Sequence, residues 1–220
     1  MNGCLGLILD LDGVVVHTDR YHFLAWKVIA DRLGIRFDET VNNRLRGVSR
    51  SDSLAILLEG YHGALPDAAG RESLCEEKNR IYRAYLEQMS PADVEDDVRE
   101  TLLILHTRGY RLGIGSSSRN ARLILQRTAM TDLFDVIADG TEITHSKPDP
   151  EVFLLAAEKL KLPPERCAVV EDAAVGIRAA KACGMTAVAL GSDAAAAQAD
   201  LCIWALPELL AAFPGSGGAV

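Results

Sequence analysis

The chain has 220 residues, of which 49% are hydrophobic and 25% charged, and its formal net charge is -8. This composition is typical of a globular protein with a sizeable core. The acidic balance argues against a nucleic-acid-binding surface, which normally needs a basic face. No stretch approaches the roughly 18 apolar residues of a membrane span. The five cysteines show no metal-ligand spacing. We therefore expect reduced thiols, no nucleic-acid or membrane partner, and a cytoplasmic location.

The first predicted element is a strand at Leu5–Leu9, a short apolar run typical of strands buried on both faces of a parallel sheet. No other strand-like run occurs between residues 17 and 92, where amphipathic patterns predict helices. These helices are expected at Arg20–Leu33, Ser51–Glu59 and Arg71–Met89. Ser90 and Pro91 form the predicted return linker, because proline ends the last of these helices.

After this insert, strand-like runs alternate with helical patterns. The further strands are predicted at Arg111–Gly115, Val136–Ala138, Cys167–Val170, Thr186–Leu190 and Leu201–Ala205. The helices between them are predicted at Val98–Arg108, Asn120–Ala129, Pro150–Lys161 and Ala173–Cys183. This alternation predicts an α/β fold with a Rossmann-like parallel sheet. We expect an α/β core domain (residues 1–16 and 93–213), a small inserted helical cap domain (17–92) and a disordered tail (214–220).

Asp10 and Asp12 directly follow the first predicted strand. Residues two apart in an extended chain point the same way, so both carboxylates would face one site at the carboxyl end of the sheet. Ligands bind at that edge in open α/β folds. Gly13 then allows the chain to turn away sharply. The alternative is a solvated turn, because so short a motif is only moderately specific.

Polar residues follow three other predicted strands. Three serines, at 116, 117 and 118, supply hydroxyls at a helix start that suit a phosphate, although serine is also an ordinary N-cap. Lys147, beside a proline that restricts the backbone, could neutralise a phosphoryl group, although a lone lysine is more often a surface charge. Glu171 and Asp172, with Asp10, offer the oxygen ligands that Mg²⁺ prefers. Together the four motifs predict a magnesium-dependent phosphoryl-transfer site with Asp10 as nucleophile.

In this order the motifs resemble those of the haloacid dehalogenase superfamily, across residues 5–205. The helical insert is similar to the subgroup with a small helical cap, and most similar to its β-phosphoglucomutase family. This second resemblance rests on the stretches Tyr21–Phe23, Trp26–Lys27, Gly47–Arg50, Asp52–Ser53, Lys78–Asn79, Ser90–Val94 and Ser118–Asn120. The chain departs from that pattern at His17, Arg119 and Ala173, where an aspartate, a lysine and a serine are usual.

The resemblance implies an enzyme that interconverts β-glucose 1-phosphate and glucose 6-phosphate. Asp10 would form an aspartyl phosphate, and Asp12 would be the general acid and base. Ser116 and Lys147 would hold the transferring group. The implied Mg²⁺ ligands are Asp10, the backbone carbonyl of Asp12, Asp172 and, in or near the shell, Glu171.

The substrates implied by the resemblance are small sugar phosphates, selected by the cap. The non-transferring phosphate would be bound by Arg50, Ser118, Arg119 and Asn120. The residues that would line the sugar pocket or support Asp12 are His22, Trp26, Gly47, Val48 and Lys78. From the residues alone, Arg50 could instead be a surface charge, and His22 and Trp26, four apart on one helix face, could be core residues.

Two rival functions stay open. One is a sugar-phosphate phosphatase of the same superfamily, in which water replaces the second sugar phosphate. The other is a phospho-accepting signalling module, which also uses a strand-end aspartate, Mg²⁺ and a lysine; the acid at Asp12 and the long insert argue against it. Because the cap must swing freely, we expect a monomer.

Overall fold

A computed structural model of the chain describes residues 3–45, 48–191 and 199–215. Within these ranges six strands form one parallel sheet in the order β3-β2-β1-β4-β5-β6. The strands are β1 (Gly6–Leu9), β2 (Arg111–Gly115), β3 (Val136–Ala138), β4 (Cys167–Glu171), β5 (Thr186–Leu190) and β6 (Leu201–Ile203). The predicted Rossmann-like sheet is thereby confirmed. Gly47 and residues 216–220 of the predicted tail lie outside the described ranges.

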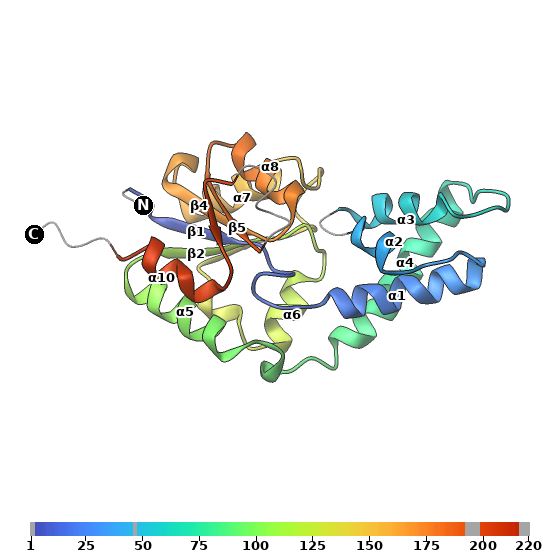
Figure 1. The fold of residues 1–220 in the computed structure, drawn as a ribbon, viewed down its shortest axis with the longest axis horizontal. Coiled ribbons are helices and arrows are strands. Elements are labelled where there is room, and N and C mark those ends of the chain that lie inside the picture. The colour runs from blue at the N-terminus through green and yellow to red at the C-terminus, as the bar shows by residue number, and fades with distance from the viewer. Residues whose placement is uncertain (1–2, 46–47, 192–198, 216–220) are drawn as a thin grey trace, which may run out of the picture.

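Helices cover both faces of this sheet (Figure 1). Successive side chains of a strand point to opposite faces. Leu7 and Leu9 of β1 accordingly pack in one hydrophobic cluster with residues of α5, α6 and α10, and Ile8 packs in another with α7 and α8. The helices of the sheet domain are α5 (Asp96–Thr107), α6 (Ala121–Arg127), α7 (Glu151–Leu160), α8 (Ala174–Ala182) and α10 (Leu209–Ala212). Short 3-10 helices are η2 (Thr131–Leu133), η3 (Pro164–Arg166) and η4 (Leu206–Glu208).

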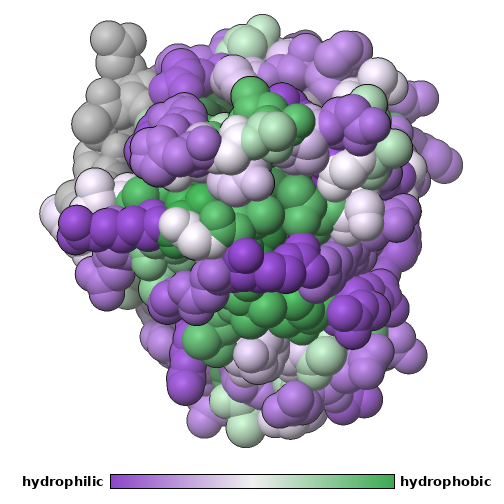
Figure 2. All heavy atoms as spheres, turned by 90° about the vertical axis from the view of Figure 1, so that its right-hand side faces the viewer, coloured by the Kyte–Doolittle hydropathy of each residue, from purple (hydrophilic) through white to green (hydrophobic). Residues whose placement is uncertain are grey.

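The segment between β1 and α5 is helical and extends beyond one end of the sheet (Figure 1). It contains α1 (Asp19–Leu33), α2 (Glu39–Asn43), α3 (Arg50–Leu58), α4 (Ala68–Leu86) and the 3-10 turn η1 (Pro91–Asp93). Its helices enclose a hydrophobic cluster of their own, which includes Trp26, Ile29, Leu54 and Leu57. On the outer end of the molecule, hydrophobic side chains form a band between hydrophilic ones (Figure 2). No helix in the described ranges is both long enough and apolar enough to span a bilayer.

Two elements of the insert differ from the sequence prediction. The five-residue α2 was not predicted, because it is too short to show a helical period; the side chain of Asp38 caps it by accepting a bond from Val41 N at 3.2 Å. The helix predicted at Arg71–Met89 begins earlier, at Ala68, because Asp67 accepts a bond from Gly70 N at 2.8 Å.

Candidate active site

The predicted site residues meet at the carboxyl edge of the three central strands. Strand β1 lies between β2 and β4, with Leu9 opposite both Ile114 and Val170. Asp10 continues this ladder, because its backbone N–H donates to Val170 O at 3.0 Å. A cavity of about 1070 Å³ opens here between the sheet and the insert. It is lined by every predicted site residue that the structure describes: Asp10, Asp12, His22, Trp26, Val48, Arg50, Lys78, Ser116, Ser118, Arg119, Asn120, Lys147, Glu171 and Asp172.

Lys147 is a buried cation between two acids. Its Nζ donates to Asp10 Oδ1 at 2.5 Å and to Glu171 Oε1 at 2.6 Å, and it lies 4.6 Å from the centre of the Phe153 ring. Burial alone would lower the pKa of Lys147, but the charges of Asp10 and Glu171 raise it above its ordinary value. The lysine therefore stays charged at neutral pH and holds one oxygen of the predicted nucleophile in place.

Asp172 lies against the turn that follows Asp12. A Cβ built on Gly13, whose φ is +86°, would be only 2.2 Å from Asp172 Oδ2, so this close approach requires glycine. Asp10, Asp12 and Asp172 therefore surround the end of β1 with acidic and backbone oxygens. This donor set fits Mg²⁺, which binds through few protein carboxylates and keeps several waters.

Both carboxylate oxygens of Glu171 already accept hydrogen bonds from the protein. Its Oε1 accepts from Lys147, and its Oε2 accepts from Ala173 N at 2.8 Å. A Cβ on Gly176 would be 1.9 Å from Oε1, so α8 also packs directly on this carboxylate. Burial raises the pKa of Glu171, although Lys147 opposes the rise. The carboxylate therefore orients Lys147, and a place in the metal shell stays a prediction.

A second group of potential metal ligands lies outside the predicted site residues, at the start of α7. Among the described residues, only His145, Asp149 and Glu151 offer three ligand atoms within 4.8 Å of one another. His145 and Asp149 are exposed, and the two Glu151 oxygens already accept from the backbone N–H groups of Thr144 and His145 at 2.9 and 2.7 Å. These bonds explain Glu151 as the residue that holds the loop before α7 against the start of that helix.

Asp12 is held by a residue at the start of the insert. Thr18 Oγ1 donates to Asp12 Oδ1, and the same hydroxyl lies 2.8 Å from Tyr82 Oη on α4. Burial raises the pKa of Asp12 to about 7; the bond from Thr18 opposes this rise and the charge of Asp10 adds to it. A carboxyl group with this pKa can both give and take a proton near neutral pH, as a general acid and base must.

Lys78 and His22 lie behind Asp12. Lys78 Nζ is 2.8 Å from His22 Nδ1, and His22 Nε2 is 3.9 Å from Asp12 Oδ2. Burial, together with the charges of Lys78 and Arg50, lowers the pKa of His22 well below its ordinary value. While Lys78 is charged its ammonium group only donates, so Nδ1 accepts and the ring carries its proton on Nε2, the nitrogen 3.9 Å from Asp12 Oδ2. Lys78 and His22 thus form a chain of contacts that ends at Asp12, and their place in a sugar pocket stays a prediction.

Trp26 satisfies both interpretations that the sequence left open. It is 2% exposed and belongs to the hydrophobic cluster of the insert, yet it also lines the cavity. Its ring centre lies 5.2 Å from Lys78 Nζ, a cation–π contact. Val48 lines the cavity as well.

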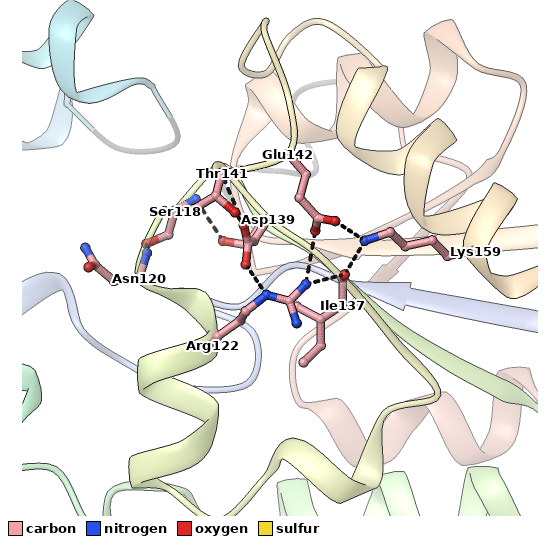
Figure 3. A network of polar contacts seen from close by, with 9 residues as sticks. Ser118, Asn120, Arg122, Ile137, Asp139, Thr141, Glu142 and Lys159 are labelled. Atoms are coloured by element: carbon pink, nitrogen blue, oxygen red, sulfur yellow. Dashed lines mark hydrogen bonds and ion pairs between the residues drawn. The ribbon is translucent and has the colours of Figure 1, made fainter.

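The loop after β2 is braced by the loop after β3 (Figure 3). Ser116 N donates to Ala138 O at 3.1 Å, and Gly140 N donates to Ser118 O at 3.1 Å. Within the loop, Ser118 N donates to Ser116 Oγ, and Asn120 N donates to Ser118 Oγ. The hydroxyls of Ser116 and Ser118 thus shape the loop as well as line the cavity. Asn120 is the N-cap of α6 and makes no side-chain cap bond, so the serines do not cap this helix, and phosphate binding stays a prediction.

A charged network fixes these two loops from behind (Figure 3). Asp139 is 1% exposed, and its Oδ2 lies 2.9 Å from Arg122 Nε. Arg122 also donates to Glu142 at 3.1 Å, and Glu142 accepts from Lys159 at 2.5 Å. Because Arg122 belongs to the first turn of α6, its pairing with Asp139 holds that helix against the end of β3.

Arg50 and Arg119 line the same cavity as Lys147. Arg50 begins α3 in the insert, and Arg119 belongs to the loop after β2. Burial lowers the pKa of the Arg50 guanidinium, and the charge of Arg119 adds to that effect. Two guanidinium groups that repel each other in one cavity favour an anion beside them, so they suit a phosphate.

Sequence reasoning missed the roles of Tyr82 and Asn79. Both line the cavity from α4, and both lie on the helix face that carries Lys78. The spacing of three or four residues along this helix was the available signal, since such residues share a face. Nothing in the sequence alone relates that face to Thr18 or to Asn120.

Comparisons with known proteins show the family of the chain. The family model for haloacid dehalogenase-like hydrolases matches residues 5–184. The chain is 42% identical to the β-phosphoglucomutase of Bacillus subtilis over 90% of this chain and 88% of that protein. It is 31% identical to a phosphorylated carbohydrates phosphatase of Thermotoga maritima, over 81% of both chains. A crystal structure of β-phosphoglucomutase from Clostridium difficile superposes with a TM-score of 0.86 at 31% identity, covering 94% of this chain and 93% of the other. The chain therefore belongs to the haloacid dehalogenase-like hydrolase family.

Proposed function

We propose that the protein is a β-phosphoglucomutase that interconverts β-glucose 1-phosphate and glucose 6-phosphate through β-glucose 1,6-bisphosphate. The observation that carries this proposal is one cavity that is lined by Lys147, bonded to Asp10, and also by Arg50 and Arg119. We assign the transferring phosphate to Lys147 at one end and the other phosphate to the two arginines at the other end. A bisphosphate needs both ends at once, and a sugar phosphate can bind in either direction.

Asp10 is the proposed nucleophile. One of its oxygens attacks phosphorus, the bond from phosphorus to the sugar oxygen breaks, and Asp12 protonates that oxygen. In the second half of the cycle, Asp12 takes the proton from the free hydroxyl of a sugar monophosphate. The hydroxyl oxygen attacks the aspartyl phosphate, the bond from phosphorus to Asp10 breaks, and the bisphosphate and the free carboxylate of Asp10 are formed again. Lys147 and Ser116 hold the transferring group throughout.

Asp10, Asp172 and the backbone carbonyl of Asp12 would hold Mg²⁺. When bound, the cation would offset the negative charge of the transferring group and of the acids around it. Glu171 would keep Lys147 pointed at the same group.

The insert would act as the cap. In this proposal residues 17–92 form the cap domain, and residues 1–16 and 93–213 form the core. Arg50, on the cap, meets the non-transferring phosphate opposite Ser118, Arg119 and Asn120, so substrate binding draws the two domains together and excludes water from the aspartyl phosphate. His22, Trp26, Val48 and Lys78 would line the sugar pocket. A monomer suffices for this motion.

A sugar-phosphate phosphatase is the second candidate, because a carbohydrate phosphatase is among the relatives. One assay separates the two. The protein is supplied with β-glucose 1-phosphate, Mg²⁺ and a trace of β-glucose 1,6-bisphosphate, and glucose 6-phosphate and free phosphate are measured together. We expect glucose 6-phosphate in large excess. Free phosphate without glucose 6-phosphate would refute the mutase and favour the phosphatase.

The nucleophile is tested by Asp10→Asn. This variant should lose all turnover, because an amide cannot form the aspartyl phosphate. Asp132→Asn, which changes an exposed aspartate of η2, is the matched control and should keep full activity. Residual mutase activity in a folded Asp10→Asn protein would show that another group attacks phosphorus.

A further inference from the structure

Three side chains from both sides of the cavity meet at one oxygen atom. Asn79 Oδ1, on α4, accepts from Arg50 Nη2 at 3.0 Å and from Asn120 Nδ2 at 2.9 Å. Asn120 belongs to the sheet domain, where it precedes α6 and is 4% exposed. The two donors are the groups proposed to bind the non-transferring phosphate. The amide oxygen of Asn79 therefore stands where an acceptor oxygen of that phosphate would be expected.

Arg83 fixes the other end of the Asn120 amide. It lies one helical turn after Asn79 on α4, and its Nη1 donates to Asn120 Oδ1 at 3.1 Å. An asparagine amide can turn over and exchange its oxygen and nitrogen. A donor on Oδ1 prevents this exchange, because the turned amide would place its NH₂ group against the guanidinium. Arg83 thus directs the NH₂ group of Asn120 towards Asn79 and Arg50.

We propose that Arg83 and Asn79 are positioning residues for the non-transferring phosphate, which act through Asn120 and Arg50. This inference rests on the proposed function and deepens it. In the free enzyme Asn79 keeps the two donors converged, and Arg83 sets the orientation of Asn120. When the sugar phosphate binds, a phosphate oxygen takes over the donors that Asn79 held. The subsite is therefore assembled in advance, and less ordering is needed on binding.

The test compares two substrates of the same site. β-Glucose 1-phosphate reacts with the phosphorylated enzyme, so its own phosphate binds at Arg50 and Asn120 while its 6-hydroxyl meets the aspartyl phosphate. Acetyl phosphate transfers its phosphoryl group to Asp10 with release of acetate and places no group at Arg50 and Asn120; water then frees phosphate from Asp10. A residue that acts only on the distal phosphate changes KM for the sugar phosphate and not the turnover of acetyl phosphate.

Arg83→Met is the main variant. We expect its KM for β-glucose 1-phosphate to rise roughly three- to tenfold, the usual range for one lost hydrogen bond. Its kcat, its acetyl phosphate turnover and its melting temperature should stay close to those of the wild type. Arg83→Lys, which retains a donor, should recover part of the loss. Arg80→Met is the matched control, since Arg80 is exposed on the same helix and does not line the cavity; it should change nothing. Asn79→Ala should raise KM in the same way.

If the wild type is a mutase, two results would overturn the inference and leave the proposed function intact. One is an unchanged KM in both Arg83→Met and Asn79→Ala. The other is an equal loss with acetyl phosphate and with the sugar phosphate, which would show a general structural role. If the wild type turns over acetyl phosphate but forms no glucose 6-phosphate, the proposed function fails, and the inference fails with it.

Discussion

Lys78 is a lysine surrounded by aromatic rings. It is 3% exposed and lies 4.5 Å from the centre of the Tyr82 ring. Within the described ranges, no carboxylate comes within ion-pair distance of it. Burial lowers its pKa from 10.5 to about 7, and the charge of Arg50 adds to the fall. The folded protein therefore holds this proton less tightly than the unfolded chain does.

Replacing Lys78 by methionine should stabilise the protein most below pH 7, where the wild type buries a charged ammonium. Between pH 7 and 10.5 the unfolded wild type binds more protons than the folded one, so its stability rises with pH and the advantage of the variant shrinks. The gain at low pH should be of the order of a few kcal/mol. Urea unfolding at about pH 6, 8 and 10 measures this trend.

Lys27→Met is the matched control for this prediction. Lys27 lies on the same insert and forms an exposed ion pair with Asp31 at 2.6 Å. Its replacement should change stability by less than about 1 kcal/mol, with no comparable trend across neutral pH. If Lys78→Met and the wild type differ in their free energy of unfolding by the same amount at every pH, burial does not lower the pKa of Lys78.

Residues at strand ends could be predicted from the sequence, whereas their partners could not. Asp10, Lys147 and Asp172 follow apolar runs, and parallel strands bring their carboxyl ends to one edge. Thr18 and Tyr82 meet across 64 residues of sequence because α1 packs on α4. No local pattern specifies that contact. The bond from Arg83 to Asn120 could not be predicted either, because it also joins residues that are far apart in the sequence.

At the scale of elements, the loop after β2 depends on a glycine in the loop after β3. A Cβ on Gly140 would be 2.2 Å from Ser117 O and 3.0 Å from Arg119 N. These are backbone atoms, which cannot move aside for an added Cβ as the end of a flexible side chain can. The two loops can therefore be this close, with Gly140 N bonded to Ser118 O, only while residue 140 is glycine.

Gly140→Ala should displace the loop after β2. We expect kcat/KM for β-glucose 1-phosphate to fall at least about tenfold, because small displacements of positioning groups are costly in catalysis. The free energy of unfolding should fall by about 1–3 kcal/mol. Steady-state kinetics and urea unfolding measure the two effects.

Gly184→Ala separates this steric effect from backbone strain. Gly184 has a φ of +73° with open space around it, so alanine there costs only strain, about 1 kcal/mol, far from the cavity. This variant should keep its activity. If Gly140→Ala is as active as Gly184→Ala, the close approach of the two loops has no part in catalysis.

Short apolar runs predicted the strands well, because strands buried on both faces are apolar throughout. β2, β3 and β5 were predicted at the bounds that the structure gives them. Helices were predicted from their period, which needs several turns to show. The short α2 offered too few residues for such a pattern, and the start of α4 depends on the cap at Asp67. The order of the strands in the sheet is a matter of tertiary packing, which the runs themselves do not encode.

At the scale of the whole molecule, the cavity gathers positive charges although the chain as a whole is negative. The chain carries a net charge of -8, yet Arg50, Lys78, Arg119 and Lys147 all line one cavity. Asp10, Asp12 and Asp172 line the same cavity at the end of β1, beside Lys147. A cation held by Asp10 and Asp172 would link β1 to the end of β4, the two neighbouring strands at the centre of the sheet.

Mg²⁺ should therefore stabilise the folded protein as well as support catalysis. At a concentration of about 100 times its Kd, a ligand that binds only the folded state adds roughly 2.7 kcal/mol, which for a chain of this size raises the melting temperature by about 5–10 °C. Thermal unfolding with and without Mg²⁺, after treatment with a chelator, measures the shift. Asp172→Asn should lose most of it, since the variant removes one of the charged ligands at the end of β1.

Asp149→Asn is the control that locates the cation. Asp149 belongs to the exposed group with His145 and Glu151, whose ligand atoms lie within 4.8 Å of one another. If Mg²⁺ binds at the end of β1, Asp149→Asn keeps the full melting shift while Asp172→Asn does not. The reverse pattern would move the cation to the start of α7. In that case the acids around Asp10 would have to be balanced by Lys147 alone, and the phosphoryl-transfer site would need a different source of positive charge.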